Sequence, residues 1–305
     1  MKKITKIMTI LVMAALVLTS CATVDGTNKT ENTMEEAKMD ESAKPVILVV
    51  SFGTSYNSSR DKTIGAIEQK IDEAYGDDYD VRRAFTAQFI INKLAARDGL
   101  IIDNMEDALQ RCIDDGVKTL VVQPTHVMAG QEDDDMVQTV KKYADKFEKV
   151  SIGTPLLSTQ ANYEEATSIL TGVTSQYDDG NTAIIYMGHG TEHAGNITYA
   201  NLQGYVDNAG FGDRYFIGTV EAHPSLSDMI ARADASGFDR VVLRPFMIVA
   251  GDHANNDMAG DEDGAWKTEF KSAGYDVECV IEGLGEIVEI QDMFVKKTAE
   301  AIANL

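Results

Sequence analysis

Short runs of β-branched and aromatic residues alternate with segments of helical periodicity along most of the chain. The runs begin at eight positions, four in each half of the sequence: Val46, Asp80, Thr119, Val150, Thr182, Arg214, Arg240 and Tyr275. Between them apolar residues recur at helical spacing, as at Ile64, Ile67 and Ile71, and residues 285–305 close the chain with a helical pattern. This alternation is typical of βα units, so we predict an α/β fold with two four-stranded parallel sheets flanked by helices.

The two halves of the chain share short motifs in the same order. "VSFGTS" at residues 50–55 is similar to "MGHGTE" at 187–192, and "VVQPTHVMAGQEDDDM" at 121–136 is similar to "RPFMIVAGDHANNDM" at 244–258. Several matches that keep their order indicate an internal duplication. We therefore predict two similar α/β domains, at residues 45–176 and 177–305.

Polar residues follow three neighbouring strands that are predicted in the second half. His189 follows the first strand, Glu221 the second and His253 the third, at a spacing of 32 residues each time. Because parallel α/β sheets bind ligands at the carboxyl ends of their strands, we expect the three side chains to meet at one edge. Two imidazoles and one carboxylate suit a divalent transition metal and leave coordination positions open. The sequence thus predicts a site for metal handling or catalysis.

For each of these three residues the alternative is a hydrogen-bonded loop position without a metal. The first half lacks this set, because its corresponding residues are Phe52, Thr86 and Glu132. Among the other histidines, His126 is interpreted as structural or as a secondary contact, and His193 as facing the same cleft or the surface. His223 precedes a proline, which favours extended backbone, and we place it outside the ligand set.

The first residues of the chain have the pattern of a bacterial lipoprotein signal. Three lysines precede the apolar run "IMTILVMAALVLTS", which leads directly into Cys21. We predict that residues 1–20 are removed and that Cys21 carries a lipid; an ordinary signal peptide is the alternative. Residues 21–44 are polar and charged, so we expect a disordered tether that holds the folded part about 25 Å from the membrane. This interpretation makes the protein an extracytoplasmic, membrane-anchored lipoprotein of the periplasm or the outer cell surface.

The acidic composition narrows the classes of partner and cofactor. A net charge of −22 argues against nucleic acid and anionic lipid as partners. Apart from Cys21, only Cys112 and Cys279 are present, which excludes a zinc ribbon but leaves one disulfide open. Neither a P-loop nor a convincing dinucleotide motif occurs, so we expect no nucleotide cofactor. A homo-oligomer is compatible with all of these features.

Several motifs of the chain resemble those of one known family, the anaerobic cobalt chelatases of the CbiK type, or sirohydrochlorin cobaltochelatases. The resemblance runs in order from about residue 45 to the C-terminal helix, and it rests on "ILVVSFGTSY", "RRAFTAQFIINKL", "GTPLLS", "MGHGTEH", "TVEAHP", "MIVAGDHANNDM" and "GLGE". It implies two α/β domains with a tetrapyrrole cleft between them, and the insertion of cobalt(II), or also iron, into sirohydrochlorin without ATP. Through these motifs the resemblance implies that His189, Glu221 and His253 bind the metal. These are the same three residues that the positions after the predicted strands indicate. Cytosolic members of the family lack the lipoprotein signal that is predicted here.

The same resemblance implies a substrate rich in carboxylates, which an acidic protein must bind through local basic or amide groups. The basic candidates near predicted strand or helix ends are Arg82, Arg83, Lys93, Arg97 and Arg244. A second group of candidates is the backbone around Ser51, Gly53, Thr54 and Ser55. The alternative for the basic residues is an ordinary surface charge.

Two other functions remain open from the sequence. One is an exported carrier lipoprotein that binds cobalt, iron, haem or another tetrapyrrole for uptake without turnover, which the predicted anchor favours. The other is a metal-dependent hydrolase that uses a metal-bound water, although no base that would position its substrate is evident.

Overall fold

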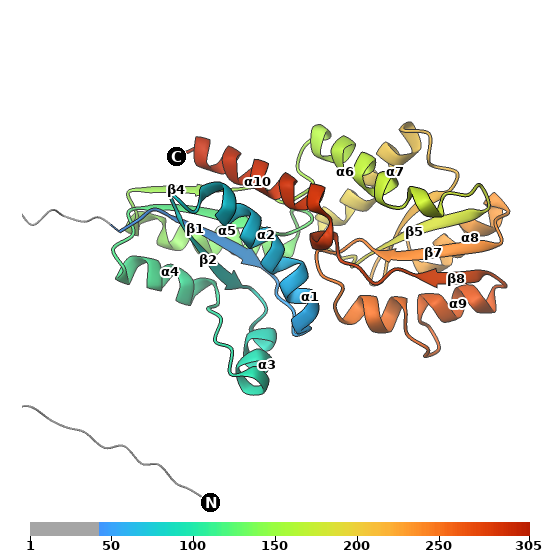
Figure 1. The fold of residues 1–305 in the computed structure, drawn as a ribbon, viewed down its shortest axis with the longest axis horizontal. Coiled ribbons are helices and arrows are strands. Elements are labelled where there is room, and N and C mark those ends of the chain that lie inside the picture. The colour runs from blue at the N-terminus through green and yellow to red at the C-terminus, as the bar shows by residue number, and fades with distance from the viewer. Residues whose placement is uncertain (1–42) are drawn as a thin grey trace, which may run out of the picture. The chain divides into compact units, whose positions relative to one another are not determined.

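Two four-stranded sheets form the framework of the protein (Figure 1). The computed structural model describes residues 43–305, which belong to one compact unit. The predicted signal, Cys21 and almost all of the predicted tether lie outside the described residues. Among those described, no helix has the length and apolar character needed to cross a membrane.

The first sheet has the strand order β2-β1-β3-β4, and all its strand pairs are parallel. Its strands are β1 (Val46–Ser51), β2 (Asp80–Phe85), β3 (Thr119–Pro124) and β4 (Lys149–Ile152). Every residue of the central strand β1 is buried, because helices cover both faces of a parallel sheet. The helices of this half are α1 (Asn57–Lys62), α2 (Ile64–Tyr75), α3 (Gln88–Asp98), α4 (Met105–Asp114), α5 (Gln131–Tyr143) and α6 (Gln160–Val173).

The second sheet repeats this arrangement, with the order β6-β5-β7-β8 and parallel pairing throughout. Its strands are β5 (Thr182–Gly188), β6 (Tyr215–Thr219), β7 (Arg240–Pro245) and β8 (Asp276–Cys279). Its helices are α7 (Ile197–Asn208), α8 (Leu226–Ser236), α9 (Trp266–Ser272) and α10 (Val288–Ala303). The prediction of two four-stranded parallel sheets flanked by helices is therefore confirmed.

Two helices pack across the predicted division at residue 176. Helix α10 packs against α2 and β3 of the first half, and in Figure 1 it runs back over that half. Lys70 donates to Asp292 across this contact at 3.0 Å. Helix α6 packs against α7, with the rings of Tyr163 and Tyr205 stacked at a centroid distance of 5.2 Å. The domain boundary itself stays a prediction.

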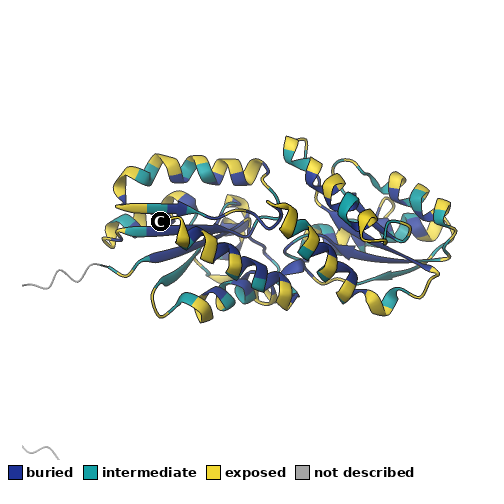
Figure 2. Ribbon diagram, turned by 90° about the horizontal axis from the view of Figure 1, so that it is seen from above, coloured by how far each residue is buried: buried dark blue, intermediate teal, exposed yellow. Residues whose placement is uncertain are grey.

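One hydrophobic cluster joins the two halves. It contains Ile47 and Val121 from the first sheet, Ile184 and Tyr186 from the second, and Phe294 from α10. Figure 2 shows buried positions running through the strands of both sheets, with exposed positions on the outer helix faces. Because the cluster is shared, we expect the described chain to unfold as one cooperative unit.

Truncation of Phe294 to alanine tests this shared core. The side chain is fully buried, so Phe294→Ala should lower the free energy of unfolding by about 3–5 kcal/mol. Val288→Ala, on the same helix but exposed, should change it by no more than about 0.5 kcal/mol. Urea unfolding followed by circular dichroism measures both. Two separate transitions in the unchanged protein would contradict a shared core.

Candidate metal centre

His189 lies directly after β5, the strand that pairs with both β6 and β7. The next residue, Gly190, has a φ of 86°, and a Cβ there would lie 2.8 Å from the backbone nitrogen of Ala222. Only glycine fits this close approach of two loops. The amide of Gly190 donates to the hydroxyl of Tyr199 at 3.2 Å, and burial raises the pKa of that phenol. The turn that carries His189 is therefore fixed on both sides.

Glu221 is placed beside His189 by backbone pairing that continues beyond the strands. The amide of Val220 donates to the Gly188 carbonyl at 3.0 Å, and the amide of Glu221 donates to the His189 carbonyl at 2.9 Å. Because parallel strands keep their register, these bonds hold the two residues side by side at the sheet edge.

His253 comes from the loop after β7, at the start of a short π-helical turn, Ala254–Met258. Short π-helical segments occur frequently at functional sites. The Nδ1 atom of His253 lies 2.7 Å from Oδ2 of Asp257 in that turn. A carboxylate at this position accepts the Nδ1 proton and leaves the lone pair of Nε2 free for a metal. Asp257 thus orients the ring and selects its tautomer.

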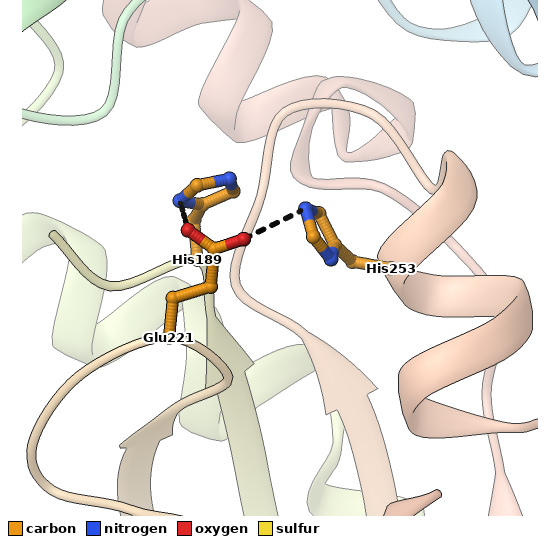
Figure 3. Close-up of side chains that lie close together, drawn as sticks. All are labelled: His189, Glu221 and His253. Carbon is orange, nitrogen blue, oxygen red and sulfur yellow. Dashed lines mark ion pairs between the residues drawn. The ribbon is translucent and has the colours of Figure 1, made fainter.

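The structure brings His189, Glu221 and His253 together (Figure 3). Each offers one ligand atom, and these atoms all lie within 4.8 Å of one another. One carboxylate oxygen of Glu221 is 3.7 Å from Nδ1 of His189, and the other is 4.0 Å from Nε2 of His253. Ligands about 2.0 Å from a shared tetrahedral ion lie roughly 3.3 Å apart, so the 4.0 Å separation needs only a small side-chain shift. Nδ1 of His189 lies 2.8 Å from the carbonyl of Gly190, which leaves Nε2 of that ring for a metal.

The three side chains are accessible from outside. Their exposed fractions are 47% for His189, 53% for Glu221 and 29% for His253. A divalent ion held by three such ligands keeps at least one coordination position for a further donor. The arrangement therefore suits an ion that is passed to a second molecule more than one that is enclosed for structural support.

The other histidines make local contacts. The side chain of His126 is 9% exposed, with Nδ1 3.3 Å from Asp133, and His193 places Nε2 3.3 Å from Asp134. His223 is 87% exposed and pairs with Asp228 at 3.2 Å, which agrees with its exclusion from the ligand set. In the part of the chain that the structure describes, the three-ligand group is formed by His189, Glu221 and His253 without any of these.

The loop after β1 touches the loop that carries His253. Tyr56 donates to Asp252 at 3.2 Å, and a Cβ on Gly251 would lie 3.6 Å from the hydroxyl of Thr54. Ser51, Thr54 and Ser55 are all buried, and Gly53 has a φ of 99°. The hydroxyl of Ser51 is hydrogen-bonded to that of Thr125 at 2.8 Å, so its side chain already has a partner at the end of the neighbouring strand. A role for this loop in carboxylate binding stays a prediction.

The arginines proposed for the substrate carboxylates are already paired. Arg82 donates to Asp80 and to Asp115, each at 2.7 Å, and Arg83 is paired with Glu68. Arg244 is buried and contacts Glu282 at 3.1 Å. Arg97 is paired with Asp98, and Lys93 is exposed. The binding of substrate carboxylates by these five residues stays a prediction. The ion pairs of the arginines do not support it.

The backbone pairing corrects one assignment in the internal repeat. The amide of Ala87 donates to the Phe52 carbonyl at 3.1 Å, as the amide of Glu221 does to that of His189. Ala87, and not Thr86, is therefore the first-half counterpart of Glu221. The counterpart of His189 remains Phe52.

Two further residues of the centre were not identified from the sequence. Asp257 could have been found from the sequence, since it follows His253 by four residues and helical spacing brings such pairs together. Tyr199 could not have been found from the sequence, because only the fold places a residue of α7 under the turn at Gly190.

The fold and this group of side chains define a class of protein. Its members have two α/β halves with parallel sheets, and two imidazoles and a carboxylate lie close enough together to bind a divalent transition metal. A family model described as "Cobalt chelatase (CbiK)" matches residues 45–303. The chain therefore belongs to the cobalt chelatase (CbiK) family, which confirms the family expected from its motifs.

Two relatives match most of the chain. It is 36% identical to the sirohydrochlorin cobaltochelatase of Salmonella typhimurium, over 85% of this chain and 97% of the relative. It is 27% identical to the sirohydrochlorin cobaltochelatase CbiKC of Nitratidesulfovibrio vulgaris, over 86% of this chain and 92% of the relative.

Solved structures of low sequence identity share the fold. SirB from Bacillus subtilis with Fe3+ has a TM-score of 0.59 at 13% identity and covers 86% of this chain and 96% of its own. CbiX, described as the terminal enzyme for biosynthesis of siroheme in denitrifying bacteria, has a TM-score of 0.51 at 14% identity, over 84% of this chain and 99% of its own. These likenesses support the chelatase-type architecture alone.

The contact between His253 and Asp257 predicts the effect of a single substitution. Asp257→Asn should weaken cobalt(II) binding by about 10–100-fold, because the amide no longer holds the imidazole in the metal-binding tautomer. Asp228→Asn is the matched control, since it alters a similar His–Asp pair at His223. Titration with cobalt(II), followed by visible absorbance, measures both. Equal affinities in the two variants would contradict a role for Asp257.

Proposed function

We propose that this protein inserts cobalt(II) into sirohydrochlorin without a nucleotide, with His189, Glu221 and His253 as the metal ligands. The observation that carries the proposal is the convergence of these three donors in a chain matched by the cobalt chelatase family over residues 45–303. The curated relatives, named for this reaction, support the same substrate pair. Cobalt is a substrate here and not a resident cofactor.

The ligand set suits the transfer of a divalent ion. Neutral imidazoles of His189 and His253 supply nitrogen donors, and the carboxylate of Glu221 adds a negative charge that favours the cation. Because all three side chains are partly exposed, a macrocycle can approach the ion from the open side. Its ring nitrogens then occupy the free coordination positions.

Insertion also requires two protons to leave the macrocycle. As each pyrrole N–H bond breaks, the electron pair stays on nitrogen and binds the metal, and the proton passes to a base. An imidazole that has given up the ion is a suitable acceptor, because histidine is the side chain that most readily takes up and releases a proton under physiological conditions. The proton then exchanges with water at the exposed site. The charges balance, since one divalent cation replaces two protons, and no ATP is consumed.

Substitution of the histidines tests the proposal. His189→Ala and His253→Ala should each lower the rate of anaerobic cobalt insertion into sirohydrochlorin by at least about 100-fold, because each removes a direct ligand. His223→Ala, at an exposed histidine away from the group, should keep the parent rate. Absorbance of the metallated product measures the rate. Parent-like rates in both ligand variants would overturn the proposed ligand set.

Carriage without turnover is a second candidate, favoured by the lipoprotein-like sequence at Cys21. A carrier would bind cobalt or a tetrapyrrole in a fixed ratio and release it elsewhere. The same assay separates the two functions. Several product molecules per protein, formed above the spontaneous rate, indicate an enzyme, whereas a single stoichiometric spectral change indicates a carrier.

We also propose export of the protein with lipid attached to Cys21, on the strength of the sequence of residues 1–21. Cys21→Ala should move the protein from the membrane fraction to the soluble fraction of cells, because the lipid is its proposed anchor. A Cys112→Ala variant, which changes a buried cysteine, is the control and should stay with the membrane. Immunoblotting of the two fractions measures the change. Retention of the Cys21→Ala protein in the membrane would contradict lipid anchoring.

A further inference from the structure

A cavity of about 300 Å³ lies beside the two segments through which the chain passes between its halves. The chain enters the second half after α6, and it returns to the first half at the start of α10. The end of α6 contributes Val173 and the turn after it contributes Tyr177, while the segment before α10 contributes Val280 and Ile287. Ligand cavities in proteins begin at roughly this size, so the space suits a small molecule. We call it the crossover cavity.

Arg244, on β7, brings a buried positive charge to the crossover cavity. Its side chain is 5% exposed. The Nη2 atom donates to Glu282 at 3.1 Å, and the Nε atom is buried without a hydrogen-bond partner. Nε and Nη2 lie on the same edge of a guanidinium, where one carboxylate can accept from both. Glu282 makes only one of these two bonds, and a buried donor without an acceptor costs free energy, so a bound carboxylate would stabilise this arginine.

The start of α10 adds a second group of donors. The helix has 16 residues, and Ile287 before it offers no side-chain cap. Among the described residues, no acceptor is found for the amides of Val288 and Glu289, and both residues line the crossover cavity. The amides and the helix dipole therefore favour an anionic group at this end of the cavity.

Three carboxylates make a ligand that is only an anion unsuitable. Glu282, Glu286 and Glu289 all line the crossover cavity, which with Arg244 gives three negative side chains and one positive. Glu286 is engaged, since its Oε1 accepts from the amide of Gly283 at 3.0 Å. Glu289 is exposed, and no ion pair engages it among the described residues. A ligand that carries a positive group beside its carboxylate compensates this excess of negative charge.

The remaining wall of the crossover cavity is apolar and is held in place by the backbone. Val173 and Val288 line it from α6 and α10. The segment before α10 is fastened to the loop after β7, because the amide of Leu284 donates to the Met247 carbonyl at 2.8 Å. An apolar group of a ligand can therefore pack here with little loss of entropy from the protein.

We propose that the crossover cavity binds a small α-amino acid with an apolar side chain, at a site separate from the metal centre. The ligand carboxylate accepts from Nε and Nη2 of Arg244, and the start of α10 favours its charge. The ammonium group pairs with Glu282 and Glu289, and the side chain packs against Val173 and Val288. The inference goes beyond the proposed function and does not depend on it, since the cavity shares no residue with the three proposed metal ligands.

Three probes that differ by one group test the pattern of charges. L-leucine carries both charges, 4-methylpentanoate lacks the ammonium group, and L-leucinamide lacks the carboxylate. Isothermal titration of the full chain in metal-free buffer should give a Kd of about 1 mM or tighter for L-leucine. Each analogue should have a Kd at least about tenfold higher, because it leaves one set of charged side chains without a partner.

Substitution of the buried arginine tests where the ligand carboxylate binds. Arg244→Leu should raise the Kd for L-leucine at least about tenfold, because it removes both donors of the fork. Arg244→Lys keeps the charge but loses the planar fork, and should give an intermediate Kd. Arg240→Leu, on the same strand but at an arginine paired with Glu278 outside the cavity, is the matched control. Thermal unfolding shows whether each variant is folded.

Glu289→Gln is a second test that leaves the buried arginine unchanged. It should raise the Kd for L-leucine about twofold to fivefold, as expected for an exposed ion pair. The Kd for 4-methylpentanoate should stay the same or fall, because the loss of a negative charge favours an anion. Glu300→Gln, at an exposed carboxylate further along α10, is the control and should change neither Kd.

The inference is supported if L-leucine binds more tightly than both analogues and the Arg244 and Glu289 variants weaken its binding as stated. It is overturned if L-leucine shows no binding up to about 10 mM, or if both sets of variants bind it as the parent does. Equal binding of 4-methylpentanoate and L-leucine would overturn it too, since the site would then select an anion. If the Arg244 variants do not fold, the three probes and Glu289→Gln decide in the same way. Cobalt insertion is measured separately, so failure of either proposal leaves the other standing.

Discussion

The candidate metal centre depends on the parallel register of β5 with its two neighbours. The hydrogen bond from the amide of Glu221 to the carbonyl of His189 extends that register one residue beyond the strands. On the other side, the amide of Phe246 donates to the Met187 carbonyl at 2.7 Å, which fixes the start of the loop that leads to His253. A shift of one residue at either strand would separate the donors, because side chains alternate between the faces of a strand.

The same backbone frame supports different chemistry in the two halves. Both sheets place a short turn after their central strand and a second turn after its neighbour, with equivalent hydrogen bonds. In the second half those turns hold His189 and Glu221, whereas in the first they hold Phe52 and Ala87. Since the frame is stabilised by buried strands common to both halves, the side chains at the sheet edge are free to differ. The side chains after the strands, and not the backbone frame, therefore distinguish the half that carries the proposed ligands.

The sequence predicts the two sheets and the convergence of the three proposed ligands, because both depend on local pattern. Apolar runs mark the strands, and His189, Glu221 and His253 each follow a strand directly or by a short loop. The sequence does not predict contacts between distant segments, such as the pairing of Arg244 with Glu282 or the packing of α10 on β3. It also misplaced the counterpart of Glu221 by one residue, since this correspondence is set by the backbone pairing of Ala87 with Phe52 and no shared motif marks it.

The three proposed ligands are held with unequal firmness, and this bears on how an ion would leave them. His189 and Glu221 are tied to the sheet by backbone bonds, while His253 lies in a loop and is oriented by Asp257. A three-donor site lets the first ring nitrogens bind the ion before any protein ligand departs, which avoids a poorly coordinated intermediate. The loop ligand is then the one that can swing away at least cost to the fold, because no strand pairing breaks with it. If the three side chains are the ligands proposed above, we infer from this difference in attachment that His253 would release the ion first and His189 and Glu221 last.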